Sequence, residues 1–123
     1  MKGELMDNSI KEKFNNNGID VQEALGRFMN NEAFYEKCLL KFLDDKNYSL
    51  LEQSMREKDY EEAFTHAHTV KGLAGNLSLI SLADVTGDLV EPLRNGNYGN
   101  VVPLFEKVKS EYEKVCIIIR EAL

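Results

Sequence analysis

The sequence predicts an all-α protein, an antiparallel up-down four-helix bundle with additional short helices at its N-terminal end. Three observations lead to this fold class. Apolar residues recur at spacings of three and four along most of the 123 residues, and no segment shows the alternation typical of a strand. Short polar connections separate the amphipathic segments, as between antiparallel neighbours in a bundle. Residues suited to capping helices precede most of these segments.

The N-terminal part of the chain is expected to hold the shorter helical segments. They span, in order, about residues 4–16, about 20–28, from about 31 to Phe42, and about 48–58. Asp20 is the expected N-cap of the second segment, and Glu23 completes a capping box with it. Asn31 or Asn30 caps the third segment, and the fourth continues that helix after a break.

The C-terminal half is expected to supply the longer helices. Asp59 caps a helix over about residues 60–77. Ser81 caps the next helix, in which Pro92 bends the last turn before the sequence N-G-N ends it. Pro103 fits the first turn of a final helix, where its missing N–H is not needed.

Charge, hydropathy and cysteine spacing exclude several classes of protein. The formal net charge is −6, and no basic stripe is present to meet the phosphates of a nucleic acid. No apolar run approaches the roughly 18 residues of a transmembrane helix, and the first residues lack the apolar core of a signal peptide. Cys38 and Cys116 are expected to be buried free thiols. We therefore expect one cytoplasmic domain over residues 1–123, without nucleic-acid or membrane partners.

The run A-H-T-V-K-G-L-A-G-N-L, residues 67–77, carries the most chemical information. On a helix with His68 set at zero, Lys71 falls about 60° to one side, Gly72 about 40° to the other, and Gly75 within about 20°. The opposite arc carries the residues expected to face the core, namely Ala63, Ala67, Val70, Leu73, Ala74 and Leu77. The helix thus presents one imidazole beside one cation, on a stripe with few other side chains.

Gly72 and Gly75 lower the stability of the helix that carries this stripe. Each glycine inside a helix destabilises it by about 0.8–1 kcal/mol relative to alanine. Because both fall on the outward face, packing between helices does not explain them. Their expected use is to let another backbone or a phosphoryl group approach His68. The alternative is that one of these glycines ends the helix.

The sequence H-T-V-K-G, followed by A-G-N-L and a second amphipathic helix, resembles the histidine-containing phosphotransfer (HPt) domain family of multistep two-component phosphorelays. The segments G-I-D-V-Q-E-A-L-G-R-F and A-F-Y-E-K-C-L-L-K-F resemble the beginning of such domains, so the likeness covers about residues 18–120. It implies that His68 is the phosphoacceptor. The accompanying family positions are Lys71, Gly72, Gly75 and Asn76. Ser78 departs from the family, in which many members have a further glycine there.

The resemblance implies a phosphorelay intermediate, which accepts a phosphoryl group on His68 from a receiver-domain aspartate and passes it to another receiver. A neutral imidazole is a competent nucleophile near neutral pH, and Lys71 is placed to balance charge on the phosphoryl oxygens. The chain itself is expected to need no cofactor, because Mg²⁺ is expected on the partner receiver. No kinase or ATP-binding segment is recognised, so we expect a phosphotransfer protein rather than an enzyme. Expected partners are receiver domains of response regulators or of a hybrid histidine kinase.

Two further residues fall toward the histidine side of the helix, Phe64 and Leu79. They are expected either to join the glycines and Asn76 in a surface that docks the receiver, or to pack internally. Two alternatives also stay open for the N-terminal helix, which carries Leu5, Met6 and Ile10. Its apolar residues either surround His68 as an apolar collar that the receiver covers, or pack over Phe64 and close the end of the bundle.

His66 lies about 160° around the helix from His68, within the inward arc. We interpret it as a structural histidine, and the two imidazoles do not share a metal ion, so no metal site is expected.

Two other functions stay open at this point. The chain can be the phosphoacceptor part of a chemotaxis-type histidine kinase, which an attached catalytic region would reveal. It can also be a helical adaptor whose histidine is never phosphorylated. We expect a monomer.

Overall fold

The computed structural model describes residues 6–123, which form α-helices joined by short turns. The helices are α1 (Asn8–Asn15), α2 (Val21–Arg27), α3 (Glu32–Leu43), α4 (Asn47–Arg56), α5 (Tyr60–Asn76), α6 (Ile80–Asn95) and α7 (Val101–Ala122). The prediction of an all-helical fold is confirmed. Within residues 6–123 the only β-type pairing is an isolated bridge between Ile19 and Leu79.

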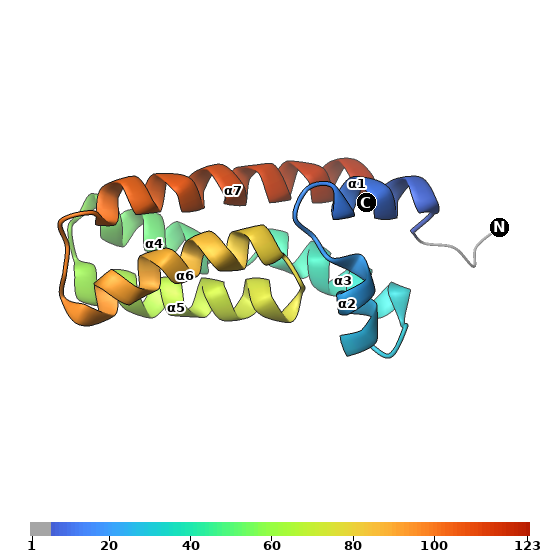
Figure 1. Cartoon of the computed structure of the whole chain (residues 1–123), viewed down its shortest axis with the longest axis horizontal. Helices are drawn as coiled ribbons and strands as arrows, with labels where there is room; N and C mark the ends of the chain where they lie inside the picture. The colour runs from blue at the N-terminus through green and yellow to red at the C-terminus, as the bar shows by residue number, and fades with distance from the viewer. Residues whose placement is uncertain (1–5) are drawn as a thin grey trace.

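The four C-terminal helices lie side by side along the long axis of the molecule (Figure 1). α5 packs against α4 and α6, and α6 packs against α7. α3 leads into α4 and contacts α7, so the longest helix has neighbours along its whole length. α1 and α2 gather at the end of the molecule where the turn between α5 and α6 lies (Figure 1).

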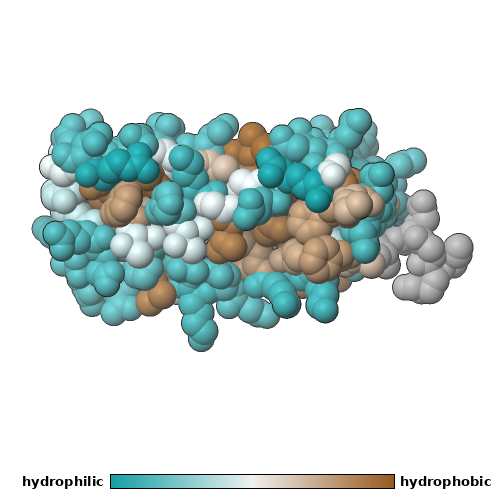
Figure 2. Space-filling view, turned by 90° about the horizontal axis from the view of Figure 1, so that it is seen from below, coloured by the Kyte–Doolittle hydropathy of each residue, from teal (hydrophilic) through white to brown (hydrophobic). Residues whose placement is uncertain are grey.

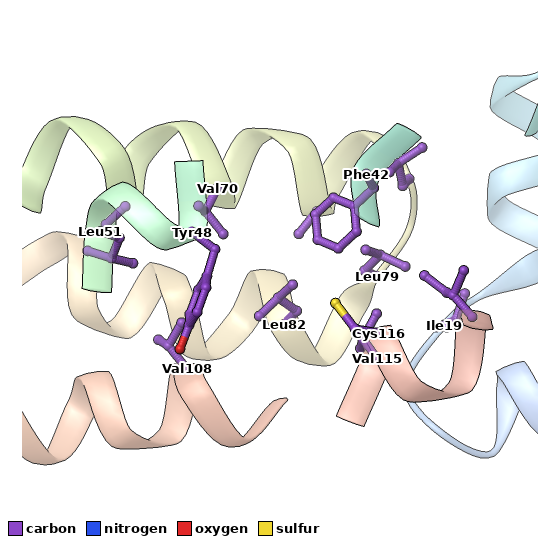
Figure 3. Close-up of a cluster of buried hydrophobic side chains, with 14 of the residues drawn as sticks. Ile19, Phe42, Tyr48, Leu51, Val70, Leu79, Leu82, Val108, Val115 and Cys116 are labelled. Atoms are coloured by element: carbon purple, nitrogen blue, oxygen red, sulfur yellow. The ribbon is translucent and has the colours of Figure 1, made fainter. Parts of the chain in front are cut away.

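The core consists of apolar side chains that these helices contribute to one continuous cluster (Figure 3). Leu51 of α4, Leu82 of α6 and Val108 of α7 are fully buried there. Tyr48 stacks on Tyr112, with ring centroids 3.8 Å apart, and burial raises the pKa of both phenols. Burial of each large apolar side chain contributes about 1.5–3 kcal/mol to the stability of the fold. This packing holds in place the helices that carry the polar site described below.

Most of the predicted helix ends are confirmed. The side chains of Asp20, Asn31 and Asp59 each accept a hydrogen bond from the backbone N–H three residues later. Gly96, with φ +71°, ends α6, and the helix continues through Pro92 to Asn95. Pro103 is the third residue of α7, within its first turn.

Two predicted caps are wrong. α6 begins at Ile80 with Leu79 as N-cap, so Ser81 lies inside the first turn and does not cap the helix. The Glu23 side chain does not return to the backbone of Asp20 to complete a capping box. It accepts a hydrogen bond from the Ser78 hydroxyl at 2.8 Å instead, while the Asp20 N–H donates to the Ser78 carbonyl at 2.9 Å.

Ser78 forms the turn between α5 and α6. Its φ is +57°, in the left-handed region that favours glycine, and its side chain is fully buried. The Leu79 N–H donates to the Ala74 carbonyl at 2.8 Å and the Ser78 N–H to Gly75 at 3.1 Å, which is a Schellman turn. The glycine that many family members have at this position therefore suits the left-handed backbone of the turn. The Ser78 side chain faces Glu23 rather than an approaching partner.

The N-terminal helix lies at the other end of α5 from Phe64, beside the C-terminal end of α7 (Figure 1). Lys13 of α1 pairs with Glu121 at 3.0 Å, and Met6 and Phe14 are fully buried. Both expectations for this helix, a collar around His68 or a cover over Phe64, are therefore wrong. Leu5 lies outside the described residues.

Candidate functional site

His68 stands in the middle of α5, and its side chain is exposed. α5 continues through Gly72 and Gly75 to Asn76, so the alternative that one of these glycines ends the helix is wrong. Within residues 6–123 the imidazole has one ring neighbour and takes part in no hydrogen bond. Both ring nitrogens are therefore free to meet a partner.

The opposite side of α5 faces the core, as predicted. Ala63, Ala67, Val70, Ala74 and Leu77 are buried, and only Leu73 of the predicted set is half-buried. Three of these residues are alanines, whose small side chains let α4 and α6 approach the α5 backbone closely. This packing fixes which side of the helix is presented outward.

Both glycines of the stripe border open space. A Cβ atom built at Gly72 or at Gly75 meets no other atom within 4 Å. Packing within the protein therefore does not require glycine at either position. The helix surface beside His68 therefore lacks side chains at two positions where glycine lowers the stability of the helix. The sequence predicted this feature.

Lys71 lies on the α6 side of His68. Its side chain runs against Gly87 of α6, where a Cβ atom would stand 3.5 Å from the lysine Cε and 3.8 Å from Nζ. Lys71 is exposed, and within the described part of the chain its ammonium forms no ion pair. Among the described residues, no carboxylate pairs with this cation of the site.

Phe64 and Leu79, the two predicted docking residues, differ in their surroundings. The Phe64 ring is half-buried and stacks on the His68 imidazole, with centroids 5.9 Å apart and planes inclined by 22°. The guanidinium carbon of Arg94, on α6, lies 5.6 Å from the centroid of the same ring. Leu79 is 0% exposed and packs in the core, so of the two alternatives for this residue internal packing is confirmed and a place on the docking surface is wrong.

His66 is half-buried on α5 and, like His68, takes part in no hydrogen bond within residues 6–123. No group of three or more histidine, cysteine or carboxylate side chains in the described residues is arranged to hold a metal ion.

An apolar groove beside the C-terminal third of α5 was missed by the sequence analysis. Asn76 and Leu73 of α5 and Phe28 and Cys38 of the α2–α3 region line this groove of about 270 Å³. Cys38 is half-buried rather than buried as predicted, whereas Cys116 is buried, and burial raises the pKa of its thiol.

Two exposed apolar side chains lie next to Phe28, which lines the groove. Phe34 is 51% exposed and packs against Phe28 with ring centroids 5.5 Å apart, and the neighbouring Met29 is 89% exposed. Figure 2 shows apolar surface gathered toward the end of the molecule that carries α2 and α3. We call Phe28, Met29, Phe34, Cys38 and Leu73 the α2–α3 patch.

Hydrogen bonds hold the α2–α3 patch at a fixed position relative to α5. The Tyr35 hydroxyl donates to the Leu77 carbonyl at 2.8 Å, next to the Ser78 contacts with Asp20 and Glu23. Gly18, with φ +82°, lies so close to Ser81 that a Cβ atom would stand 2.0 Å from its Oγ. These contacts hold the α2–α3 patch beside the C-terminal end of α5, where residues of both line the same groove.

Comparison with known protein families gives a match. The family model described as Hpt domain matches residues 45–116, more than half of the chain, and the matched segment contains His68. Comparison with curated proteins and with solved structures gives no significant match. Among the helices of residues 6–123, none has the length and apolar character needed to cross a membrane.

Proposed function

The chain belongs to the Hpt domain family, whose members are histidine phosphotransfer modules of phosphorelays, and on this premise we propose that His68 is its phosphoacceptor. The proposed protein takes a phosphoryl group from the aspartate of one receiver domain and passes it to another. The observation that carries the proposal is the exposed imidazole of His68, beside bare glycines and a lysine that forms no ion pair with any described residue. We further propose that it works as a monomeric cytoplasmic module, with α4 to α7 as an up-down four-helix bundle.

The proposed transfer is a displacement at phosphorus. The lone pair of His68 Nε2 attacks the phosphorus atom of the receiver's aspartyl phosphate, and an N–P bond forms while the P–O bond to the aspartate breaks. The bonding electrons leave with the carboxylate, and the proton on Nδ1 stays on the ring, so the phosphorylated imidazole carries a positive charge. In-line approach is the main requirement of such a step, and the exposed ring allows it.

Lys71 is proposed to balance the negative charge on the phosphoryl oxygens. Its ammonium lies one turn from His68 and has no carboxylate partner within residues 6–123. Mg²⁺ held by the receiver would supply further positive charge to the phosphoryl oxygens. The transfer requires no nucleotide site and no kinase activity on this chain.

The receiver is proposed to dock across Gly72, Gly75 and Asn76 onto the α2–α3 patch. The glycines leave room for its backbone, and Asn76, about 80° around α5 from His68, lines the groove. Exposed apolar area rimmed by polar residues is typical of protein interfaces. Because the family's partners are receiver domains, an apolar surface beside the C-terminal end of the histidine helix is best explained as their docking site.

The docking proposal predicts that Phe34→Glu raises the KM for a phosphorylated receiver by about fivefold or more, because a carboxylate buried in the interface without a partner costs about 1–3 kcal/mol or more. Ile117→Glu is the matched control, since Ile117 on α7 is 52% exposed and Phe34 51%. Transfer kinetics at varied receiver concentration measure the effect. Equal KM values for the two variants would place the receiver elsewhere.

Gly72→Gln is expected to separate stability from function. Glutamine forms helices better than glycine by about 0.5–1 kcal/mol, and its Cβ meets nothing within 4 Å, so the free energy of unfolding should rise. The longer side chain should obstruct the receiver and slow transfer. Denaturant unfolding and transfer rates measured on one preparation check both expectations, and an unchanged transfer rate would show that the bare surface is not needed.

The direct test of the proposed function is to mix the unmodified chain with a receiver domain that carries phosphate on its aspartate, in the presence of Mg²⁺. We expect the chain to acquire a label that is labile in acid and stable in base, as a phosphohistidine is. If no label appears with any of several phosphorylated receivers, the helical adaptor becomes the better assignment.

A further inference from the structure

We propose that Phe64 and Arg94 are positioning residues that hold the His68 imidazole in the orientation required for transfer. The inference rests on the proposed function and gives Phe64 a role other than docking. Its basis is a three-membered array across two helices. Arg94 of α6 lies over the Phe64 ring at 5.6 Å, and Phe64 stacks on His68 at 5.9 Å.

The direction of side chains on a helix explains the stack. Side chains lean toward the N-terminus of their helix, so a residue meets the one four positions earlier. His68 therefore leans toward Phe64, and the planes of the two rings are inclined by only 22°. An exposed imidazole without hydrogen bonds would otherwise sample several rotamers, whereas a flat neighbour favours the one in which the rings overlap.

Arg94 holds the Phe64 ring in turn. Its guanidinium forms an ion pair with Glu91, which restricts the arginine to the outer surface of α6. A planar guanidinium over an aromatic face makes both a stacking and a cation–π contact. The ring is thus held between α5 and α6, and the orientation of the imidazole depends on a helix that contributes no atom to the transfer itself.

The array predicts an effect on the rate of the chemical step more than on affinity for the receiver. Alignment of reacting groups governs the rate within the complex. Phe64→Leu is therefore expected to lower the maximal transfer rate about tenfold with KM changed less than twofold, and Phe64→Tyr to restore the rate. Arg94→Gln should cause a smaller loss of the same kind, and Arg94→Lys should restore it only in part, because lysine lacks the planar group.

Tyr98→Leu is the matched control. It removes another aromatic contact of α5, between Tyr60 and Tyr98 at 4.5 Å, without touching His68. We expect its transfer rate to match the unmodified chain.

A second readout tests the array even without a receiver. In the unphosphorylated protein, the ring current of Phe64 should shift the carbon-bound imidazole protons of His68 in the NMR spectrum. Phe64→Leu should move these signals toward free imidazole, and Tyr98→Leu should leave them in place. A raised KM with an unchanged maximal rate would make Phe64 a docking residue and overturn the proposal, as would unchanged NMR signals. Failure of the unmodified chain to accept phosphate would refute the proposed function instead, whatever the NMR result.

Discussion

His68→Gln is expected to abolish phosphoryl acceptance, whereas His66→Gln leaves it within about twofold of the unmodified chain. Glutamine keeps the helix and a polar side chain but offers no nucleophilic ring nitrogen, so the loss should reach the background of the assay, at least about a thousandfold. His66 is half-buried and lies about 160° around α5 from His68, so a receiver docked over the glycines does not reach it.

The comparison of His68→Gln with His66→Gln tests function rather than folding, because His68 makes few contacts. It has no hydrogen bond within residues 6–123, and its one ring contact is the stack on Phe64. His68→Gln should therefore unfold within a few degrees of the unmodified chain in thermal melts. Label that survives in His68→Gln but disappears in His66→Gln would contradict the assignment of the site.

Lys71→Ala is expected to slow transfer by about ten- to a hundredfold, since a single charged or hydrogen-bonding group that meets developing charge commonly contributes this much or more. The fold should be unaffected, because Lys71 is exposed and forms no ion pair in the part of the chain that the structure describes. Rapid-quench kinetics at saturating phosphorylated receiver measure the rate, and thermal melts of the same samples measure the fold.

Gly87 provides a matched pair of variants for the same claim. An alanine Cβ there would lie 3.5 Å from Lys71 Cε, an ordinary contact, so Gly87→Ala should transfer nearly as fast as the unmodified chain. Gly87→Leu would occupy the path of the lysine along α6 and push the ammonium away from His68. We expect it to approach the rate of Lys71→Ala. Normal transfer by Gly87→Leu would mean that the observed path of Lys71 does not matter to the reaction.

The histidine stripe could be predicted from the sequence because it depends on one helix alone. Periodicity places His68, Lys71, Gly72 and Gly75 relative to each other, and the buried arc opposite, from Ala63 to Leu77, fixes which side faces out. Capping by Asp59 follows from its own position in the sequence.

Leu79 shows where this reasoning fails. An angle extrapolated along α5 does not apply to Leu79, because α5 ends at Asn76, and Ser78, with its left-handed backbone, then reverses the direction of the chain. A residue after such a turn no longer follows the angle of the helix before it, and Leu79 points into the core. Ser81 was misplaced for the same reason, since the turn is too short to leave it outside α6.

The remaining parts of the site come from elements that lie far apart in the sequence. Gly87 and Arg94 reach the histidine face only through the register of α6 against α5, which no single-helix pattern specifies. The α2–α3 patch reaches the end of α5 through the hydrogen bonds of Ser78 and Tyr35. Long-range contacts of this kind are properties of the packed structure.

The most direct test of the central claim is to identify the phosphorylated atom. Chain labelled with ¹⁵N is phosphorylated by a receiver and then examined for one-bond coupling between phosphorus and an imidazole nitrogen. We predict coupling to a single nitrogen, Nε2 of His68. Coupling to a nitrogen of His66, or a phosphoryl group found on an oxygen atom, would contradict the account.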